Sequence, residues 1–352
     1  MTPTEPQVLD EAAACVGRLL GCSVAGAQMI RAGGNNRIVR VERRGEPPCI
    51  VKVYFRHPAD RRDRLTTELE ALSFLWRHGI RQVPQPLAAD PERGMAVYGF
   101  IDGTPIAPDT IGPDEIAAAV RMLNVLHGLR DADGADRLGP ASEAFFSLEG
   151  LLANLRERYR RHATIEGSEP VFDAYRAFRD GPLRRALDEI EGAAREAAVA
   201  IGAELPLAGR TLSPSDFGLH NAVRQPSGSI AFLDFEYFGW DDPAKTVCDF
   251  CYHPAMALSP IMAELFAAAA IRQLDGARLR DRIRHLFPIF GLKWCFILLN
   301  EFLPEVRLRR TLASGRSGPA NDLLSLQLVK ARAMLDRVTN ERERDGFAGI
   351  AP

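Results

Sequence analysis

Side chains that could hold a metal ion and accept a proton are grouped in one stretch of the chain. Two short apolar runs, residues 221–224 and 230–235, are joined by a Pro/Ser/Gly-containing connection, an order typical of a β-hairpin. Asp216 and Asn221 lie at or before the start of the first run, and Asp234 lies near the end of the second. Because a hairpin brings its outer ends together, we expect these three side chains to converge on one small volume.

Three oxygen-bearing side chains around one point suit a hard cation that keeps some of its water, typically Mg²⁺, together with a phosphate. They also include a carboxylate that could accept a proton from a hydroxyl. Phosphoryl transfer uses both parts, because a metal offsets phosphate charge and a second residue orients the nucleophile. A single acid in a polar hairpin is more often a solvated surface group. The ordered set of Asp, Asn five residues later and a closing Asp-Phe-Glu favours phosphoryl transfer.

This segment resembles the catalytic segment of the aminoglycoside phosphotransferase and choline kinase-like family, small-molecule relatives of the protein kinases. The resemblance implies that Asp216 is the catalytic base and that Asn221 and Asp234 bind Mg²⁺. Residues 239–244, Gly-Trp-Asp-Asp-Pro-Ala, resemble a Gly-Asp-Pro-Ala element of the same family. One position departs from the pattern, because the family usually has His two residues before the base and this chain has Pro214.

Composition bounds the class of protein. The chain has 352 residues, of which 46% are hydrophobic and 26% charged, and these are ordinary globular values. A net charge of −2 gives no electrostatic argument for a nucleic-acid partner. We see no apolar run of membrane-spanning length and no signal-peptide pattern at the N-terminus. We therefore expect a cytoplasmic protein without a nucleic-acid or membrane partner.

The six cysteines are scattered. Cys248 and Cys251 form a CxxC pair with His253 nearby, which could suggest zinc, but no second pair completes a four-ligand site. Reduced thiols buried on a helix are the expected alternative.

The N-terminal part alternates between one helix and several strands. A helix is expected over residues 6–20, followed by strands over 23–30, 37–42 and 49–55. Gly33, Gly34 and Asn35 lie between the first two strands. Glycines in a tight turn free backbone N–H groups that can bind phosphates. The same residues are also typical of an ordinary hairpin turn.

Lys52 lies inside the third of these strands. In such a run a lone lysine usually faces solvent, but in kinases this position contacts the α- and β-phosphates of ATP and a helix glutamate. Residues 61–78 carry leucines at helical spacing and supply that helix. Glu68 lies beside the leucine stripe and Glu70 lies away from it, so the resemblance implies Glu68 as the partner of Lys52.

Residues 95–103 indicate a strand that ends in a turn. The resemblance implies that this segment is the hinge between two lobes, where backbone groups of Gly99, Phe100 and Ile101 bind adenine. We place the boundary near Gly103, with a nucleotide-binding N-lobe over residues 1–103 and a catalytic, acceptor-binding C-lobe over 104–352. Helices are expected in the second part over these residues: 113–129, 148–162, 181–201, 260–273, 286–302 and 321–343.

Acceptor-binding residues are sought after Asp234, because the acceptor hydroxyl must reach the base. The candidates combine aromatic rings with carboxylates, which attract cations and sugar-like rings. They are Tyr237, Trp240, Asp241, Asp249, Trp294 and Glu301. Trp294 and Glu301 lie on the expected helix 286–302, and for them a satisfied hydrogen bond in the core is the competing interpretation. For Asp249, a brace of the catalytic loop is the alternative.

These expectations combine into an α+β, bilobal protein kinase-like fold that binds ATP and Mg²⁺ and phosphorylates a hydroxyl of a small polar molecule. Aminoglycoside-, sugar- and amino-alcohol-like acceptors, and nucleosides, remain open, as does the oligomeric state. One alternative is an inactive nucleotide-binding pseudokinase or scaffold, which Pro214 favours. A protein kinase is disfavoured, because the short stretch between Asp234 and Asp242 leaves little room for an activation segment.

Overall fold

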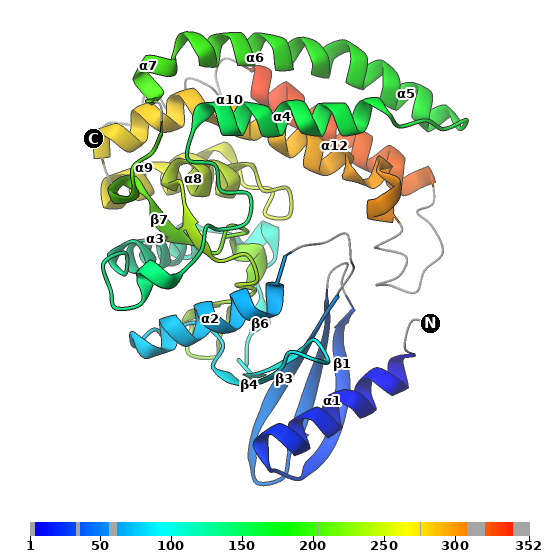
Figure 1. The fold of residues 1–352 in the computed structure, drawn as a ribbon, viewed down its shortest axis with the longest axis vertical. Helices are drawn as coiled ribbons and strands as arrows, with labels where there is room; N and C mark the ends of the chain where they lie inside the picture. Colours follow the sequence, from blue (N-terminus) through cyan, green and yellow to red (C-terminus); the bar gives the residue numbers. More distant parts are fainter. Residues whose placement is uncertain are drawn as a thin grey trace.

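The computed structural model describes residues 4–32, 36–55, 62–202, 204–274, 276–307 and 321–340. The chain forms two lobes, a sheet with helix α1 at one end and a larger helical assembly at the other (Figure 1). The sheet has the strand order β1-β2-β3-β5-β4, and every neighbouring pair is antiparallel. The elements of this N-lobe are α1 (Glu5–Leu20), β1 (Val24–Ala32), β2 (Asn36–Arg43), β3 (Glu46–Tyr54), α2 (Arg64–Arg77), β4 (Pro86–Asp90) and β5 (Met95–Gly99).

The N-lobe follows from its apolar pattern. Helix α1 buries Val8, Ala12, Cys15 and Val16 against inward-facing residues of the sheet. It stops at Gly21, which adopts the left-handed conformation (φ 65°) that a residue without a Cβ tolerates best. The expected helix and first three strands are confirmed with ends shifted by a few residues. Strand β4 was not expected, because Pro84 before it and Pro86 at its first position obscure the alternating pattern.

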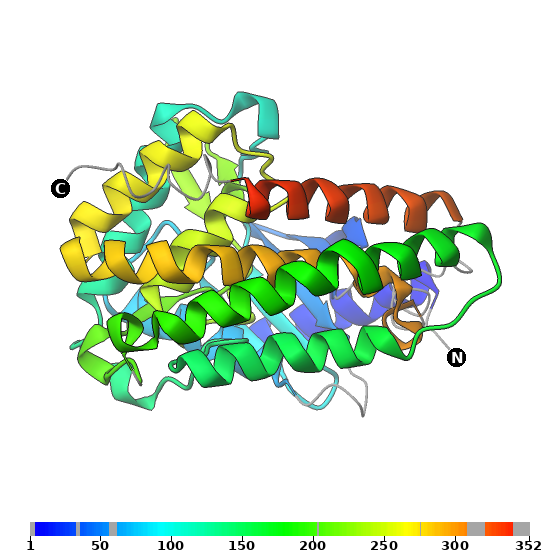
Figure 2. The same ribbon diagram turned by 90° about the horizontal axis from the view of Figure 1, so that it is seen from above.

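The C-lobe is mainly helical. Its helices are α3 (Pro113–Gly128), α4 (Leu148–Ala163), α5 (Pro170–Phe178), α6 (Arg184–Glu196), α7 (Ala198–Ile201), α8 (Pro243–Tyr252), α9 (Pro260–Leu274), α10 (Gly276–Leu299) and α12 (Asn321–Thr339). Helices α4, α6 and α12 pack against α10, and α5 packs against α12, so that the five run alongside one another as a bundle (Figure 2). Short 3₁₀ turns occur at Pro108–Thr110, Ala135–Arg137, Leu207–Gly209, Leu219–Asn221 and Asn300–Phe302.

Two helix predictions in this lobe were wrong in their bounds. The helix expected over 181–201 is divided into α6 and α7, and a π-helical turn (Arg179–Leu183) connects α6 to the unexpected α5. Helix α10 begins ten residues before the expected start at 286 and continues through Pro288. Charged residues in its first turns masked the periodicity on which the shorter prediction rested. Cys248 and Cys251 lie buried on α8, as expected.

Helix α10 lies at the centre of the C-lobe core. Among the described residues, Arg278–Phe302 is long and apolar enough to cross a bilayer, but 78% of its most apolar window is buried inside the fold. Helices α4, α6, α8, α9 and α12 all pack against it. A helix that is apolar nearly all round belongs in a core when other helices cover it in this way.

The expected catalytic hairpin is present. Strands β8 (Ala222–Arg224) and β9 (Ile230–Phe232) pair antiparallel, with Ala222 opposite Phe232, and β6 (Thr104–Pro105) adds a third strand. Both strands are shorter than expected, because Asn221 belongs to a 3₁₀ turn and the chain leaves the sheet after Phe232. Beside it, β7 (Thr211–Ser213) pairs with β10 (Gly239–Asp241). These two short sheets position the loops described next.

Candidate active site

The loop that carries Asp216 leaves β7 and rests on a buried polar scaffold. Ser215 has a left-handed backbone (φ 66°), and its hydroxyl donates to the Ser142 carbonyl over 2.6 Å. The Lys245 ammonium donates to that hydroxyl over 2.9 Å and to Asp241 Oδ2 over 2.6 Å. Lys245 and Asp241 are almost entirely buried. Ser215, the residue before the candidate base, is therefore held by the Lys245 ammonium, which is itself paired with Asp241.

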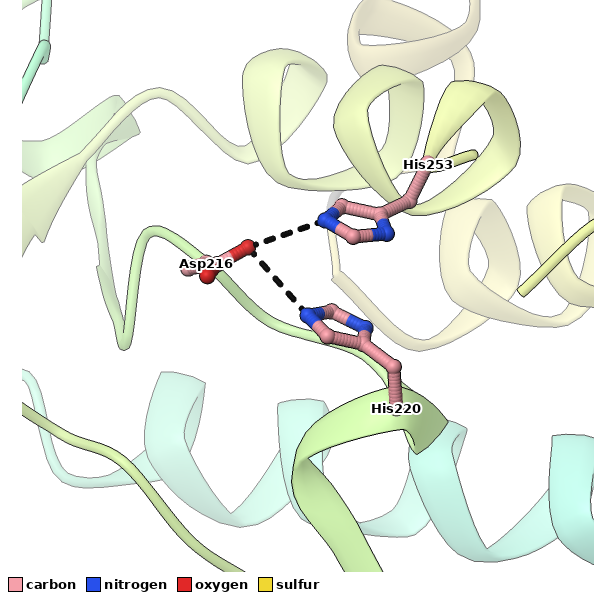
Figure 3. A group of neighbouring side chains, drawn as sticks. All are labelled: Asp216, His220 and His253. Carbon is pink, nitrogen blue, oxygen red and sulfur yellow. Dashed lines mark ion pairs between the residues drawn. The ribbon is translucent and has the colours of Figure 1, made fainter. Parts of the chain in front are cut away.

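Asp216 faces the edges of two stacked histidine rings, His220 and His253 (Figure 3). Its Oδ1 is 3.2 Å from His253 Nε2 and 3.4 Å from His220 Nε2. The carboxylate remains 39% exposed, so it is accessible to a ligand. Burial opposes its ionisation, but the two imidazoles beside it outweigh burial and hold the pKa of Asp216 below its ordinary value. Asp216 is therefore an ionised proton acceptor at neutral pH.

Asn221 ties the base loop to the end of β9. Its side-chain Nδ2 donates to the Asp216 carbonyl over 3.1 Å and lies 3.5 Å from Asp216 Oδ2. Its own carbonyl accepts from the Leu233 N–H over 2.7 Å, directly before Asp234. With Nδ2 committed to Asp216, the amide oxygen of Asn221 remains as a ligand atom for a cation.

Lys52 is the centre of a buried charge cluster. Its ammonium lies 2.6 Å from Glu68, 2.6 Å from Asp234 and 3.1 Å from Glu236. Burial alone would lower the pKa of Lys52, but the surrounding carboxylates raise it well above its ordinary value. The structure thus joins strand β3, helix α2 and the segment after β9 through one charged side chain.

The donor set beside Lys52 fits a divalent cation. The Glu68, Asp234 and Glu236 carboxylates approach within 4.8 Å of one another, which concentrates negative charge beside Lys52 and Arg64. Asp234 is the most open of the three, with its side chain 33% exposed and its backbone at φ 65°. A hard cation with oxygen ligands would compensate that charge.

The candidate glycine-rich loop, Gly33, Gly34 and Asn35, lies outside the described residues. Asn36, the next residue, donates through Nδ2 to Glu236 over 2.5 Å. Asn36 therefore links the start of β2 to the Lys52 cluster.

Two backbone N–H groups of the candidate hinge, residues 99–101, already donate to backbone carbonyls of the N-lobe. The Gly99 N–H donates to the Gln85 carbonyl over 2.8 Å, and the Phe100 N–H donates to the Pro48 carbonyl over 3.3 Å. Within the described part of the chain, the Ile101 N–H has no such partner. Of the three donors expected to face adenine, the structure leaves that of Ile101 available.

The candidate acceptor residues divide into two groups. Trp294 and Asp249 are both buried beside His253: the Trp294 indole donates to Asp249 Oδ1 over 2.9 Å, a satisfied hydrogen bond in the core, and packs edge-on against the His253 ring at 4.7 Å. The others have different surroundings. Asp241 pairs with Lys245, Trp240 donates to the Ala135 carbonyl, Tyr237 lies beside Arg62 and Arg64, and Glu301 is buried at 3% exposure.

Sequence reasoning missed His220 and His253 as neighbours of the base. His220 lies four residues after Asp216 in a loop, and His253 follows α8, far along the chain. Burial lowers the pKa of His253 despite the adjacent Asp216, so its imidazole is neutral at neutral pH. The spacing of Asp241, Lys245 and Asp249 at i, i+4 and i+8 was a usable signal for the buried ion pairs on α8.

Comparison with known proteins places this geometry in a family. The model of the Phosphotransferase enzyme family (APH) matches residues 26–286. No curated protein matches the chain in sequence. The chain belongs to the Phosphotransferase enzyme family and is a small-molecule kinase with a bilobal protein kinase-like fold.

Solved structures show the same fold at low identity. Spectinomycin phosphotransferase APH(9)-Ia, in complex with ADP and spectinomycin, is 11% identical with a TM-score of 0.61, covering 92% of this chain and 98% of its own. A choline/ethanolamine kinase family protein from Mesorhizobium loti is 16% identical with a TM-score of 0.61, covering 97% and 98%. Macrolide 2'-phosphotransferase MphH from Brachybacterium faecium is 16% identical with a TM-score of 0.58, covering 89% and 100%.

Proposed function

We propose that this protein transfers the γ-phosphoryl group of ATP to a hydroxyl of a small polar molecule. The proposal rests on an open, ionised Asp216 that is hydrogen-bonded to Asn221. Asn221 in turn accepts from the N–H of Leu233, the residue before Asp234, and Asp234 contacts Lys52. Base, metal ligands and phosphate-binding lysine are the components that phosphoryl transfer requires. The same assignment gives residues 1–103 to nucleotide binding and 104–352 to catalysis and acceptor binding.

In this mechanism Asp216 accepts the proton of the acceptor hydroxyl as that oxygen bonds to the γ-phosphorus and ADP leaves. Lys52, held by Glu68, positions the phosphates. Asn221 and Asp234 would hold Mg²⁺, which when bound offsets phosphate charge. Ile101 would contact adenine through its backbone, and Gly33, Gly34 and Asn35 would cover the phosphates.

The acceptor side of the proposal rests on Trp294 and Asp249. An indole and a carboxylate beside His253, which contacts the base, favour a small hydroxylated molecule, with an amine or a sugar-like ring as its second feature. Related proteins are named for spectinomycin, choline or ethanolamine, and macrolides, which are small molecules with hydroxyl groups. We place the reaction in the cytoplasm, where ATP is abundant, with neither nucleic acid nor membrane as a partner.

The test separates chemistry from nucleotide binding. Asp216→Asn should lower ADP release with a panel of aminoglycosides, sugars, amino alcohols and nucleosides by about 10²- to 10⁴-fold, the usual cost of removing a general base. Calorimetric affinity for ATP with Mg²⁺ should survive, because the base acts mainly in the transition state. Asp188→Asn, which changes an exposed acid on α6, is the matched control.

Two outcomes would contradict the proposal. Near wild-type turnover by Asp216→Asn would remove Asp216 as base. ATP binding by the wild type with no acceptor phosphorylated would favour a nucleotide-binding scaffold, the alternative that Pro214 in place of the family's histidine suggests.

A further inference from the structure

The two histidines beside Asp216 have no role in the mechanism above. His253 ends helix α8, and His220 belongs to the 3₁₀ turn Leu219–Asn221. Their rings are stacked, with centroids 3.7 Å apart and planes 10° from parallel. Both Nε2 atoms point to the same oxygen, Oδ1 of Asp216 (Figure 3).

A metal ion is one interpretation of two histidines and a carboxylate. An imidazole binds a metal through a lone pair that lies in the plane of its ring. Two nearly parallel, stacked rings have planes that do not meet near their nitrogens, so one ion cannot lie in both. An N–H···O hydrogen bond tolerates a larger departure from the ring plane. The geometry therefore favours a carboxylate held by N–H donors.

The tautomer of His253 supports this interpretation. The Ala255 backbone N–H donates to His253 Nδ1 over 3.3 Å, so Nδ1 is an acceptor and carries no proton. In a neutral imidazole the proton then resides on Nε2, which is 3.2 Å from Asp216 Oδ1. Oδ1 is thus occupied, and Oδ2, which lies 3.5 Å from Asn221 Nδ2, keeps a lone pair for an incoming hydroxyl.

We propose that His253 is a positioning residue for the base: it donates its Nε2 proton to Oδ1 of Asp216 and so directs Oδ2 toward the acceptor. This role rests on the proposed function. The family usually has a histidine two residues before the base, and this chain has Pro214 there. His253, at the end of α8, would instead supply an imidazole that contacts the base.

The remaining contacts hold the His253 ring in place. The His220 ring covers one face of it, and the Trp294 ring packs edge-on at 4.7 Å and 79°. Gly218 makes room for this stack, because a Cβ there would lie 2.5 Å from His220 Nδ1 and 2.9 Å from Met256 Sδ. The glycine two residues after the base is therefore a packing requirement of the pair.

The kinetic test uses two substitutions of one ring. His253→Phe keeps an aromatic ring for stacking but removes the Nε2 donor, and His253→Gln offers an amide N–H in its place. We expect His253→Phe to lower kcat about 10- to 100-fold, the range for losing a group that orients another. KM for ATP should change less than about twofold, and His253→Gln should recover most of kcat. His78→Phe, at a half-buried histidine after α2 that contacts neither Asp216 nor Lys52, should leave kcat unchanged.

A spectroscopic test needs no acceptor and so separates this inference from the proposed function. In ¹⁵N-histidine NMR, with the His253 signals identified by their absence in His253→Phe, we expect a protonated Nε2 and a bare Nδ1. Asp216→Asn should move the Nε2 signal. A protonated Nδ1, or an Nε2 signal that ignores Asp216→Asn, would overturn the proposal even if the protein phosphorylates acceptors. Equal kcat in His253→Phe and wild type would also overturn it.

Discussion

Lys245 offers the strongest test of how the catalytic loop is supported. Its side chain is 1% exposed and its partner Asp241 is fully buried, with Nζ and Oδ2 2.6 Å apart. At an effective dielectric constant of about 20, two unit charges at that distance attract by about 6 kcal/mol, most of which desolvation offsets. Removing one partner is a different matter, because it leaves the other charge buried and unpaired. We therefore expect Lys245→Met to lower the free energy of unfolding by about 3–5 kcal/mol.

The pair also makes a pH-dependent prediction. Burial raises the pKa of Asp241, and Lys245 is the main opposing influence. Without that lysine the carboxyl should take up a proton in the folded state more readily than in the unfolded state. The deficit of Lys245→Met should therefore shrink as pH falls through the raised pKa of Asp241, and should be largest near neutral pH.

Urea unfolding followed by tryptophan fluorescence measures the effect. Arg160→Met, which breaks an exposed ion pair with Glu157, is the control and should cost less than about 1 kcal/mol. Asp241→Asn and the double variant complete a cycle, in which the double variant should lose at least ~1 kcal/mol less than the two single losses combined. A loss for Lys245→Met no larger than that for Arg160→Met would refute the reasoning.

Two further predictions address other buried groups. Asp234→Ala should weaken ATP binding more with Mg²⁺ than without it, while Lys52→Met should weaken both, and equal losses for Asp234→Ala in the two calorimetric titrations would remove it as metal ligand. His162 is 1% exposed, and burial lowers its pKa to about 4. Its contribution to the free energy of unfolding is therefore full above about pH 6.5, and about 3 kcal/mol of it is lost as pH falls to about 4. Unfolding of His162→Gln should depend less steeply on pH over that window, and an unchanged slope would contradict the assignment.

The parts of the site that sequence could predict are those encoded by short-range patterns. The leucine stripe of α2 selects Glu68 over Glu70, and the structure places Glu68 against Lys52. The hairpin turn brings Asn221 to Leu233, next to Asp234. Both relations depend on periods of 3.6 and 2 residues, which can be counted in the sequence.

The parts that sequence could not predict depend on packing between distant elements. His253 meets Asp216 only because α8 packs beside β7. Helix α10 tolerates Pro288 because neighbouring helices bury it, and local propensity alone would end the helix there. The availability of the Ile101 N–H follows from the register of β5 against its neighbours, which no local pattern determines.

Glu68 accepts hydrogen bonds from donors in both lobes. One oxygen binds Lys52 and the Tyr54 hydroxyl, and the other accepts from the Phe235 N–H over 3.0 Å. In protein kinases the helix that bears this glutamate can swing outward, and its position is a point of control. Here such a swing would break the Lys52 pair and release the backbone beside Asp234 in one step. The outward position would therefore cost the hydrogen bonds of both Glu68 oxygens, so we expect α2 to keep its inward position without an activating partner.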